Sequence, residues 1–254
     1  MLKTNRKPNP CLRVRISPFC ICGLICIIAF LCPRSFDGAI CLGAGAQGNQ
    51  ETLEQVLRQM EAVGKSFKSF SANFSQKKYT SVLKEFDAPE SGEFYYARGK
   101  DGSALLRQEV IIPGKRILTI KGGMATVYNP VIKQAQIVNL GKNKDKAEYL
   151  ALGLGQSPAK LQATFEIEYR GVDEVGSTPC SVLLLKPKSS SVAAYFSAIT
   201  LWVKKATGVP IQQKLQEPSG DYLLVNFSNE KLNAKIPESK FEQQMPSGID
   251  IQRY

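Results

Sequence analysis

The period of the hydrophobic pattern changes early in this chain, and the change limits what it can fold into. In "LEQVLRQMEAV", at 53–63, apolar residues recur every three or four positions, which is typical of an amphipathic helix that ends near Gly64. From "SFSANFSQ", at 69–76, they recur every second residue, so each segment has one apolar and one polar face. One helix followed by many strands predicts an antiparallel sheet with a helical cover.

Further alternating segments, separated by short turns, fill most of the chain. They are "SGEFYYAR", "LLRQEVII", "KRILTIKGGMATVYNP", "QAQIVNL", "FEIEYRGV", "CSVLLLKPK", "SAITLWVKK", "PIQQKLQEP" and "DYLLVNFSNEKLN". Two short helices are expected at 145–154 and 158–165, the second with Ser157 as its cap and Pro158 as its first residue. A short helix that holds Phe241 and a terminal strand complete the pattern.

About ten strands are close to the limit for an open sheet that does not curl. We therefore expect an α+β fold, mainly β, in which a strongly curved antiparallel sheet forms an incomplete barrel. Its concave face is apolar, and the helices are the natural lid over that cavity.

The first 46 residues differ from the rest and predict a secretory signal. A basic start is followed by an apolar run of about 17 residues, 16–32, and then by small residues. Cleavage is expected after Ala46, with Cys41 as the alternative site. An uncleaved anchor is the other alternative, although the run is at the short limit for a membrane span of about 20 residues. Segment 1–46 is thus the cleavable signal, and 47–254 is one exported domain.

Cysteine and histidine content exclude several classes of protein. Six of the seven cysteines lie in 1–46, so Cys180 remains alone and the exported domain has no disulfide of its own. The chain has no histidine, which excludes Ser-His-Asp and Cys-His catalysis and the usual zinc sites, and we expect no metal or cofactor. Glu166 and Glu168 share a strand face, but such a pair is usually a solvated edge, so we expect no enzyme.

Residues 47–254 are moderately basic. They hold 27 Lys and Arg against 21 Asp and Glu, which leaves a net charge of +6. No arginine-rich tract or aromatic RNA-binding signature accompanies this charge, so nucleic acid is not an expected partner. The charge has two alternative explanations. One is attraction to an anionic membrane surface or to an acidic partner, and the other is an ordinary solvated surface.

Several segments, taken in order, resemble the periplasmic lipoprotein carrier family LolA. They are "SFSANFSQKK" at 69–78, "SGEFYYAR" at 91–98, "ILTIKGGMATVYNPVIKQAQI" at 117–137 and "ITLWVKKATGVPIQQKLQEPSGDYLLVNFSNEKLNAKIPESKFEQQMPSGIDI" at 199–251. The likeness spans nearly all of the exported part. The tryptophans that this family tends to have in the second strand and in the hairpin are missing, and the only tryptophan is Trp202.

The resemblance implies a function in lipoprotein transport. It implies a monomeric periplasmic chaperone that binds the acyl chains of lipoproteins in a hydrophobic cavity and shuttles them from the inner to the outer membrane. An ATP-driven exporter in the inner membrane and a receptor in the outer membrane are the implied partners. Cargo identity is not determined by the sequence.

The resemblance and the alternation together assign candidate residues. The acyl-chain cavity is expected to be lined by Phe70, Ala72, Phe74, Phe94, Tyr96, Leu118 and Ile120. A register slip of one residue would replace the last two with Ile117 and Thr119. The lid is expected to contain Leu53, Val56, Leu57, Met60, Leu150, Leu152 and Leu154. The alternative is that all of these residues form an ordinary, permanently packed core.

Arg98 falls where the resemblance implies an arginine that hydrogen-bonds the lid backbone and holds the empty form shut. A guanidinium suits this role, because it has five donors and a permanent charge. The usual Arg-Pro is Arg98-Gly99 here, and Arg107 competes for the role.

Two alternative functions share this architecture. One is a carrier of another lipid or a glycolipid, and the other is an envelope-stress sensor of stray lipoproteins. Sensors of this kind usually have a second domain, for which this chain has no room.

Overall fold

The structure is a computed structural model that describes residues 51–141 and 149–254. Within these ranges thirteen strands form one sheet. The strands are β1 (Ser69–Thr80), β2 (Glu85–Phe86), β3 (Glu90–Arg98), β4 (Ala104–Ile112), β5 (Arg116–Lys121), β6 (Met124–Asn129), β7 (Gln134–Asn139), β8 (Phe165–Val175), β9 (Thr178–Pro187), β10 (Ala198–Lys204), β11 (Val209–Gln216), β12 (Tyr222–Leu232) and β13 (Asp250–Arg253). The helices are α1 (Leu53–Ser66), α3 (Pro158–Thr164) and α4 (Ser190–Ala193), and the 3₁₀ turns are η2 (Tyr149–Ala151) and η3 (Glu238–Phe241).

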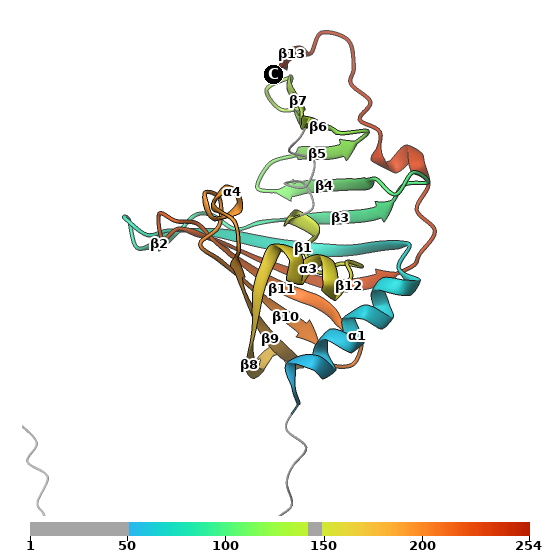
Figure 1. Cartoon of the computed structure of the whole chain (residues 1–254). Coiled ribbons are helices and arrows are strands. Elements are labelled where there is room, and N and C mark those ends of the chain that lie inside the picture. The colour runs from blue at the N-terminus through green and yellow to red at the C-terminus, as the bar shows by residue number, and fades with distance from the viewer. Residues whose placement is uncertain (1–50, 142–148) are drawn as a thin grey trace, which may run out of the picture. The chain divides into compact units, whose positions relative to one another are not determined.

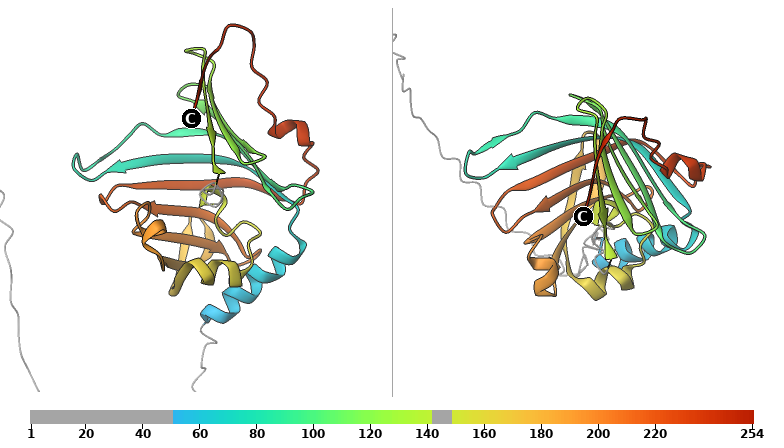
Figure 2. Two further views of the ribbon diagram at one scale, coloured as in Figure 1. Left: turned by 45° about the horizontal axis from the view of Figure 1, so that its top comes forward. Right: turned by 90° about the horizontal axis from the view of Figure 1, so that it is seen from above.

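The sheet is strongly curved and does not close. Its strand order is β13-β7-β6-β5-β4-β3-β1-β12-β11-β10-β9-β8, and β2 pairs with β1 outside this path. Neighbours are antiparallel except β13 and β7, which are parallel. Register shifts in β1, β3, β8 and β10 favour bending, because a bulge increases local twist. Figures 1 and 2 show the strands as an arch, with α1 and α3 inside it. The predicted fold class is confirmed.

Helix α1 begins with a complete capping box. Thr52 accepts a hydrogen bond from the backbone N–H of Gln55, whose side chain accepts one from the N–H of Thr52. Val56, Leu57 and Met60 form its buried face. The helix continues two residues beyond the end expected at Gly64. At Gly64 it lies close to the backbone of Gln156, where an added Cβ would be 3.3 Å from the carbonyl oxygen.

The segment before α3 differs from the expectation of a helix over 145–154. Residues 142–148 lie outside the described part of the chain, and only the single 3₁₀ turn η2 is helical in the remainder. Gly153 and Gly155 have positive φ angles of 78° and 66°, which a helix cannot contain. By contrast, α3 has Ser157 as its cap and Pro158 as its first residue, as predicted.

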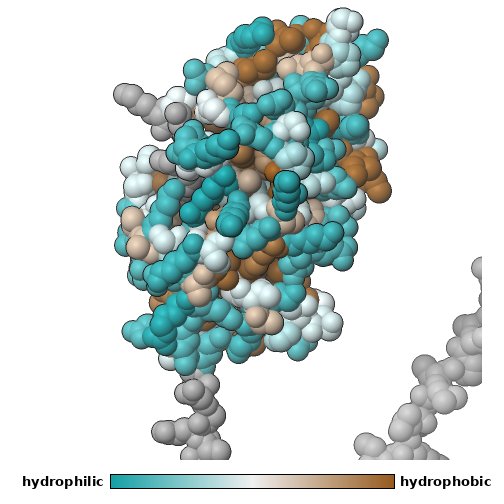
Figure 3. Space-filling view, turned by 90° about the vertical axis from the view of Figure 1, so that its right-hand side faces the viewer, coloured by the Kyte–Doolittle hydropathy of each residue, from teal (hydrophilic) through white to brown (hydrophobic). Residues whose placement is uncertain are grey.

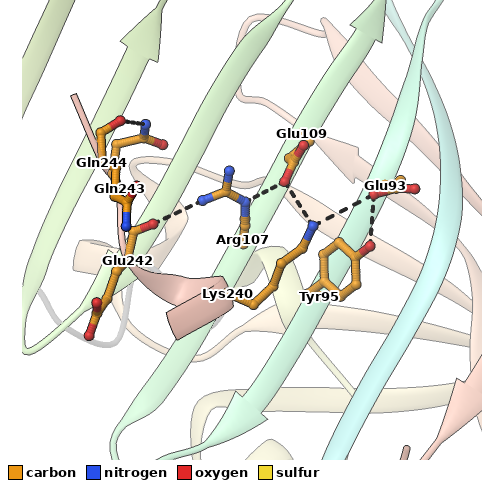
Figure 4. Close-up of polar contacts among 8 residues, drawn as sticks. All are labelled: Glu93, Tyr95, Arg107, Glu109, Lys240, Glu242, Gln243 and Gln244. Atoms are coloured by element: carbon orange, nitrogen blue, oxygen red, sulfur yellow. Dashed lines mark hydrogen bonds and ion pairs between the residues drawn. The ribbon is translucent and has the colours of Figure 1, made fainter. Parts of the chain in front are cut away.

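The C-terminal residues cross the convex face of the sheet before β13 joins β7 (Figure 1). Phe241, in η3, packs with Ala97 and Leu105. Beside it, the ammonium of Lys240 lies 3.1 Å from Glu109 Oε1 and 4.3 Å from the centre of the Tyr95 ring. Figure 4 shows that these contacts join η3 to two neighbouring strands.

Charge pairing is strong in this contact. Burial alone would raise the pKa of Glu109, but hydrogen bonds from Arg107 and Lys240 outweigh burial and lower it. Burial alone would lower the pKa of Lys240, and the hydrogen bond to Glu109 reverses that effect. Both groups therefore keep their charges at neutral pH.

We expect Phe241→Ala to lower the free energy of unfolding by about 3 kcal/mol, because a fully buried ring would leave a cavity against the sheet. Urea unfolding followed by circular dichroism measures the change. Tyr254→Ala, at an exposed site, is the control and should change stability by less than about 0.5 kcal/mol. Equal effects of the two substitutions would contradict this account of the convex face.

Candidate functional site

Aromatic side chains line one half of the concave face. Phe70 lies edge-on to Phe94 and Phe227, with ring centres 6.2 Å and 5.5 Å away. The half is one hydrophobic cluster of buried residues: Phe67, Phe70, Ala72, Phe74, Phe94, Tyr96, Leu106, Val110, Ile120, Ala151, Leu154, Val209, Val225 and Phe227. Leu118 is partly buried and packs against it. The structure thus brings together all seven residues proposed from the sequence for the cavity.

The packing of β5 shows which of its side chains face the concave side of the sheet. Leu118 and Ile120 pack with the aromatic cluster on the concave face. Ile117 belongs to a separate cluster with Tyr128 and Ala135. The register with Leu118 and Ile120 inside is therefore the one that the chain adopts.

The other half of the concave face is aliphatic, and α1 lies on it. Its buried residues are Val56, Leu57, Met60, Leu152, Leu161, Phe165, Leu183, Leu185, Ile199, Leu201, Val203 and Leu215, with Leu53 packed at the margin. Four of the proposed lid residues, those on α1, thus contact the strands β9 to β11 rather than the aromatic half.

Residues 151–156 fill the space between the two halves. Ala151 and Leu154 pack in the aromatic cluster, and Leu152 packs in the aliphatic one. The side chain of Leu150 lies outside the described residues. A Cβ on Gly155 would lie 2.1 Å from Cγ of Phe67, and one on Gly153 would lie 2.8 Å from Pro210. Only glycines allow the segment to lie this deep.

Two side chains of the sheet hold this segment by its backbone. Nε2 of Gln213, on β11, donates to the carbonyl oxygen of Leu152 at 3.0 Å, and the contact is buried. Arg98, at the end of β3, donates to the carbonyl oxygen of Gly155. Its guanidinium also lies 5.7 Å from the centre of the Phe67 ring.

Arg107, the competing arginine, is on the other side of the sheet. Its Nε donates to Glu109 at 2.5 Å, and its Nη1 donates to the carbonyl oxygen of Glu242 at 3.2 Å. Figure 4 shows it among the convex-face contacts. Arg98 is therefore the arginine that contacts the segment over the concave face.

In this structure the concave face is covered by buried side chains of α1 and of residues 151–156. Phe70, Phe94 and Leu154 all belong to the aromatic cluster and are almost fully buried. A pocket of about 420 Å³ opens at the margin, lined by Glu61, Lys65, Tyr96, Arg98 and Lys160, among others. Figure 3 views the protein from the end where α1 finishes, and hydrophilic side chains cover most of it.

The N-terminal end of α1 is tied to the sheet. Glu51 Oε2 accepts hydrogen bonds from Ser181 at 2.6 Å and Tyr169 at 3.1 Å, and lies 3.2 Å from Lys205. Burial alone would raise the pKa of Glu51, but these hydrogen bonds lower it. Gln59 adds a hydrogen bond to the carbonyl oxygen of Lys205.

The other end of α1 is tied as well. Asn233 donates to the carbonyl oxygen of Ser66 at 3.1 Å and accepts from the backbone N–H of Lys68 at 2.7 Å. Both ends of α1 are therefore hydrogen-bonded to the sheet or to the residues that flank it.

Gln213 was not a candidate from the sequence, although a signal was present. In "PIQQKLQ" it occupies the inward position between Ile211 and Leu215, where the alternation calls for an apolar residue. A buried amide at such a position needs a partner, which here is the carbonyl of Leu152.

The carboxylate pair on β8 lies at the edge of the sheet. Glu168 forms ion pairs with Arg170 and Lys186, and the hydrogen bond from Lys186 lowers its pKa. Cys180 is buried, and burial raises the pKa of its thiol. Across the described residues no helix has the length and apolar character needed to cross a membrane.

Comparison with known proteins identifies the family of this chain. The family described as outer membrane lipoprotein carrier protein LolA matches residues 65–244. The chain belongs to the LolA family. The outer-membrane lipoprotein carrier protein of Pseudomonas putida KT2440 is 23% identical over 214 residues, which cover 84% of this chain and 92% of that protein. The protein of the same name from Hahella chejuensis KCTC 2396 is 24% identical over 74% of this chain and 84% of its own length.

A solved structure of low sequence identity also aligns with much of the chain. An uncharacterised conserved protein from Thermus thermophilus aligns over 80% of this chain and 100% of that protein, with a TM-score of 0.49 and 13% identity. The family resemblance stated from the sequence is confirmed by the family match.

We expect Gly155→Ala to loosen the covering segment, because the new methyl group would collide with the Phe67 ring. The collision should lower the free energy of unfolding by about 1–3 kcal/mol beyond the backbone cost. Urea unfolding and amide exchange at residues 151–156 measure the effect.

Gly102→Ala is the matched control. Gly102 also has a positive φ angle, 77°, but an added Cβ would meet nothing within 4 Å. It should cost about 1 kcal/mol and leave exchange at 151–156 unchanged. If both variants loosened the segment equally, the contact with Phe67 would not control it.

Proposed function

We propose that this protein is a periplasmic carrier that shields the acyl chains of lipoproteins between the inner and the outer membrane. Membership of the LolA family supports a role in lipoprotein transport. The observation that carries the proposal is the apolar concave face, closed by a segment that two sheet side chains hold by its backbone. Each acyl CH₂ removed from water contributes about 0.8 kcal/mol, so an anchored lipoprotein needs such a shield to leave a membrane.

In this proposal the concave residues bind cargo only after the cover has moved. Ala151, Leu152 and Leu154 leave the two clusters, and acyl chains take their place against Phe70, Phe94 and Ile120. Apolar contacts are lost and regained in similar amounts. The exchange therefore has a small net free energy, and loading and release are both feasible.

The segment at 151–156 is the moving part in this proposal, and α1 stays in place. The bonds of Glu51, Gln59 and Asn233 fix α1 to the sheet. Residues 151–156 belong to no strand, and they are held by hydrogen bonds from Gln213 and Arg98 and by burial of Leu152 and Leu154. Local opening of one short segment costs less free energy than unfolding of the sheet.

Arg98 and Gln213 serve as latches of the empty form. Each bonds a carbonyl of the segment in the closed state, so each favours that state and opposes retention of cargo. The latches thereby favour release.

Family membership supports the proposed partners and location, and the leader expected at residues 1–46 agrees with them. We propose secretion directed by residues 1–46, loading by an ATP-driven exporter in the inner membrane, and delivery to a receptor in the outer membrane. The protein acts as a monomer. The family consists of carriers, and no catalytic step is needed for this cycle.

Native mass spectrometry of the protein purified from its own periplasm tests the function. We expect a bound diacylated or triacylated polypeptide. A bound free lipid or glycolipid would instead support the alternative carrier. Cargo that cross-links only to the convex face would contradict the proposed site.

We expect Arg98→Leu to slow the release of cargo by about fivefold, because the closed form would lose a hydrogen bond to Gly155 worth about 1 kcal/mol at this solvent-exposed position. Transfer of a labelled lipoprotein to acceptor membranes measures the rate. Arg107→Leu removes an arginine from the adjacent strand on the opposite face and is the control. Unchanged transfer by Arg98→Leu would remove Arg98 from the mechanism.

A further inference from the structure

Exposed aliphatic side chains gather at one end of the sheet. Strands β1, β4 and β6 run in the same direction, because β3 and β5 lie antiparallel between them. The turns that follow these three strands are therefore at the same end. Among the exposed large hydrophobic residues of the described chain, six lie at these turns: Val82, Leu83, Ile111, Ile112, Val131 and Ile132. Each is more than half exposed, from 54% for Ile111 to 87% for Val82.

Two of these turns have the same construction. Residues 81–84 are Ser-Val-Leu-Lys and residues 130–133 are Pro-Val-Ile-Lys, so each presents two exposed aliphatic residues before a lysine. Both lysines are in the left-handed region, with φ angles of 56° for Lys84 and 52° for Lys133. Glycine or asparagine fits that region better. Turn formation alone therefore explains neither the aliphatic pairs nor the lysines.

The base of the β1–β2 turn is rigid. Tyr79 stacks on Tyr222 with ring centres 4.9 Å apart, and Phe86 lies 5.2 Å from Tyr79. Ser81 donates its backbone N–H to Asp221 at 2.8 Å. Val82 and Leu83 are thus held outward on a fixed support instead of folding back on the protein.

Turns at the opposite end of the sheet are polar. The β3–β4 turn is Gly-Lys-Asp-Gly-Ser, the β5–β6 turn is Gly-Gly, and the β10–β11 turn is Lys-Ala-Thr-Gly. Among the described residues, these turns contain none of the exposed large hydrophobic side chains. Figure 3 views this opposite end, and hydrophilic side chains predominate there. The aliphatic residues thus distinguish the turns after β1, β4 and β6 from these three turns at the opposite end.

Positive charge accompanies the aliphatic pairs. Lys84, Lys115 and Lys133 follow the three pairs within three residues, and none of them has an ion pair among the described residues. Arg116 is paired with Glu90 at 2.8 Å, and Glu85 and Asp87 are the nearby acids in sequence on β2 and after it. The turns themselves carry unpaired positive charge.

We propose that this end of the sheet docks directly on a bilayer that contains anionic phospholipids. The aliphatic pairs enter the acyl boundary, and the lysines extend to the phosphate groups, which is the arrangement that Lys side chains favour at an interface. The projections come from three separate turns, and a fluid bilayer accepts each of them independently. This membrane contact goes beyond the carrier function and does not depend on it.

Tryptophan placed at the turns tests the proposal. In a Trp202→Phe background, Leu83→Trp and Ile132→Trp each report one turn, and Lys100→Trp reports the opposite end. With vesicles of phosphatidylcholine and phosphatidylglycerol in equal amounts, we expect blue-shifted emission and quenching by brominated lipids at 83 and 132 only. Any effect of the leader is the same in all three variants.

Matched variants test each component. Val82, Leu83, Val131 and Ile132 changed together to Ser should lower vesicle binding at least about tenfold, without loss of stability because all four are exposed. Lys84→Gln with Lys133→Gln should weaken binding to anionic vesicles, whereas Lys100→Gln with Lys231→Gln, which changes the net charge equally, should not.

Three results would overturn the proposal: no spectral shift at 83 and 132, an equal shift at 100, or equal binding to pure phosphatidylcholine. Cargo transfer measured on the same variants separates the two proposals. A variant that loses vesicle binding but still binds cargo would show that these residues serve membrane docking and not the carrier function. A variant that loses cargo binding but still binds vesicles would show the reverse.

Discussion

A curved sheet that does not close leaves an apolar concave face. Helix α1 and residues 151–156 cover this face. Phe70, Phe94 and Phe227 form a packed aromatic group that water must not reach. Helix α1 covers the aliphatic half with branched and long side chains. The aromatic half is covered by residues 151–156, which contribute few large groups. The two covers therefore differ in construction: one is a helix, and the other is a short irregular segment.

The weaker cover depends on glycine and on backbone hydrogen bonds. Gly153 and Gly155 bring the chain so close to Pro210 and Phe67 that larger residues would not fit. Gln213 and Arg98 bind carbonyl groups instead of side chains. Such contacts hold single backbone positions. They suit the proposed movement of this segment, because they can break and form again without unfolding the sheet.

Much of the fold could be predicted from the sequence, because the strands alternate clearly. Phe70, Ala72 and Phe74 are two residues apart, and their common face follows directly from strand geometry. Ser157 and Pro158 marked the start of α3 for similarly local reasons. The helix expected over 145–154 was wrong in its described part, since leucine spacing there competes with two glycines in positive φ.

Long-range placement was harder to predict. Alternation alone left the two faces of β5 equivalent, and packing against opposite sides of the sheet distinguishes Leu118 from Ile117. Likewise Arg98 and Arg107 look similar in sequence, yet their strands direct them to opposite faces. The contact of Gln213 with Leu152 joins residues 61 positions apart, and no local pattern contains it.

The parallel pairing of β13 with β7 has a consequence for assembly of the chain. A parallel pair cannot form as a hairpin, so the last strand reaches its place only after the connecting residues have crossed the convex face. Until then β7 is an unprotected edge with free backbone donors and acceptors, open to pairing with another unfinished copy. Once β13 has joined, the free edge at this side of the sheet is a strand of only four residues, which offers fewer backbone groups to another copy than the six residues of β7.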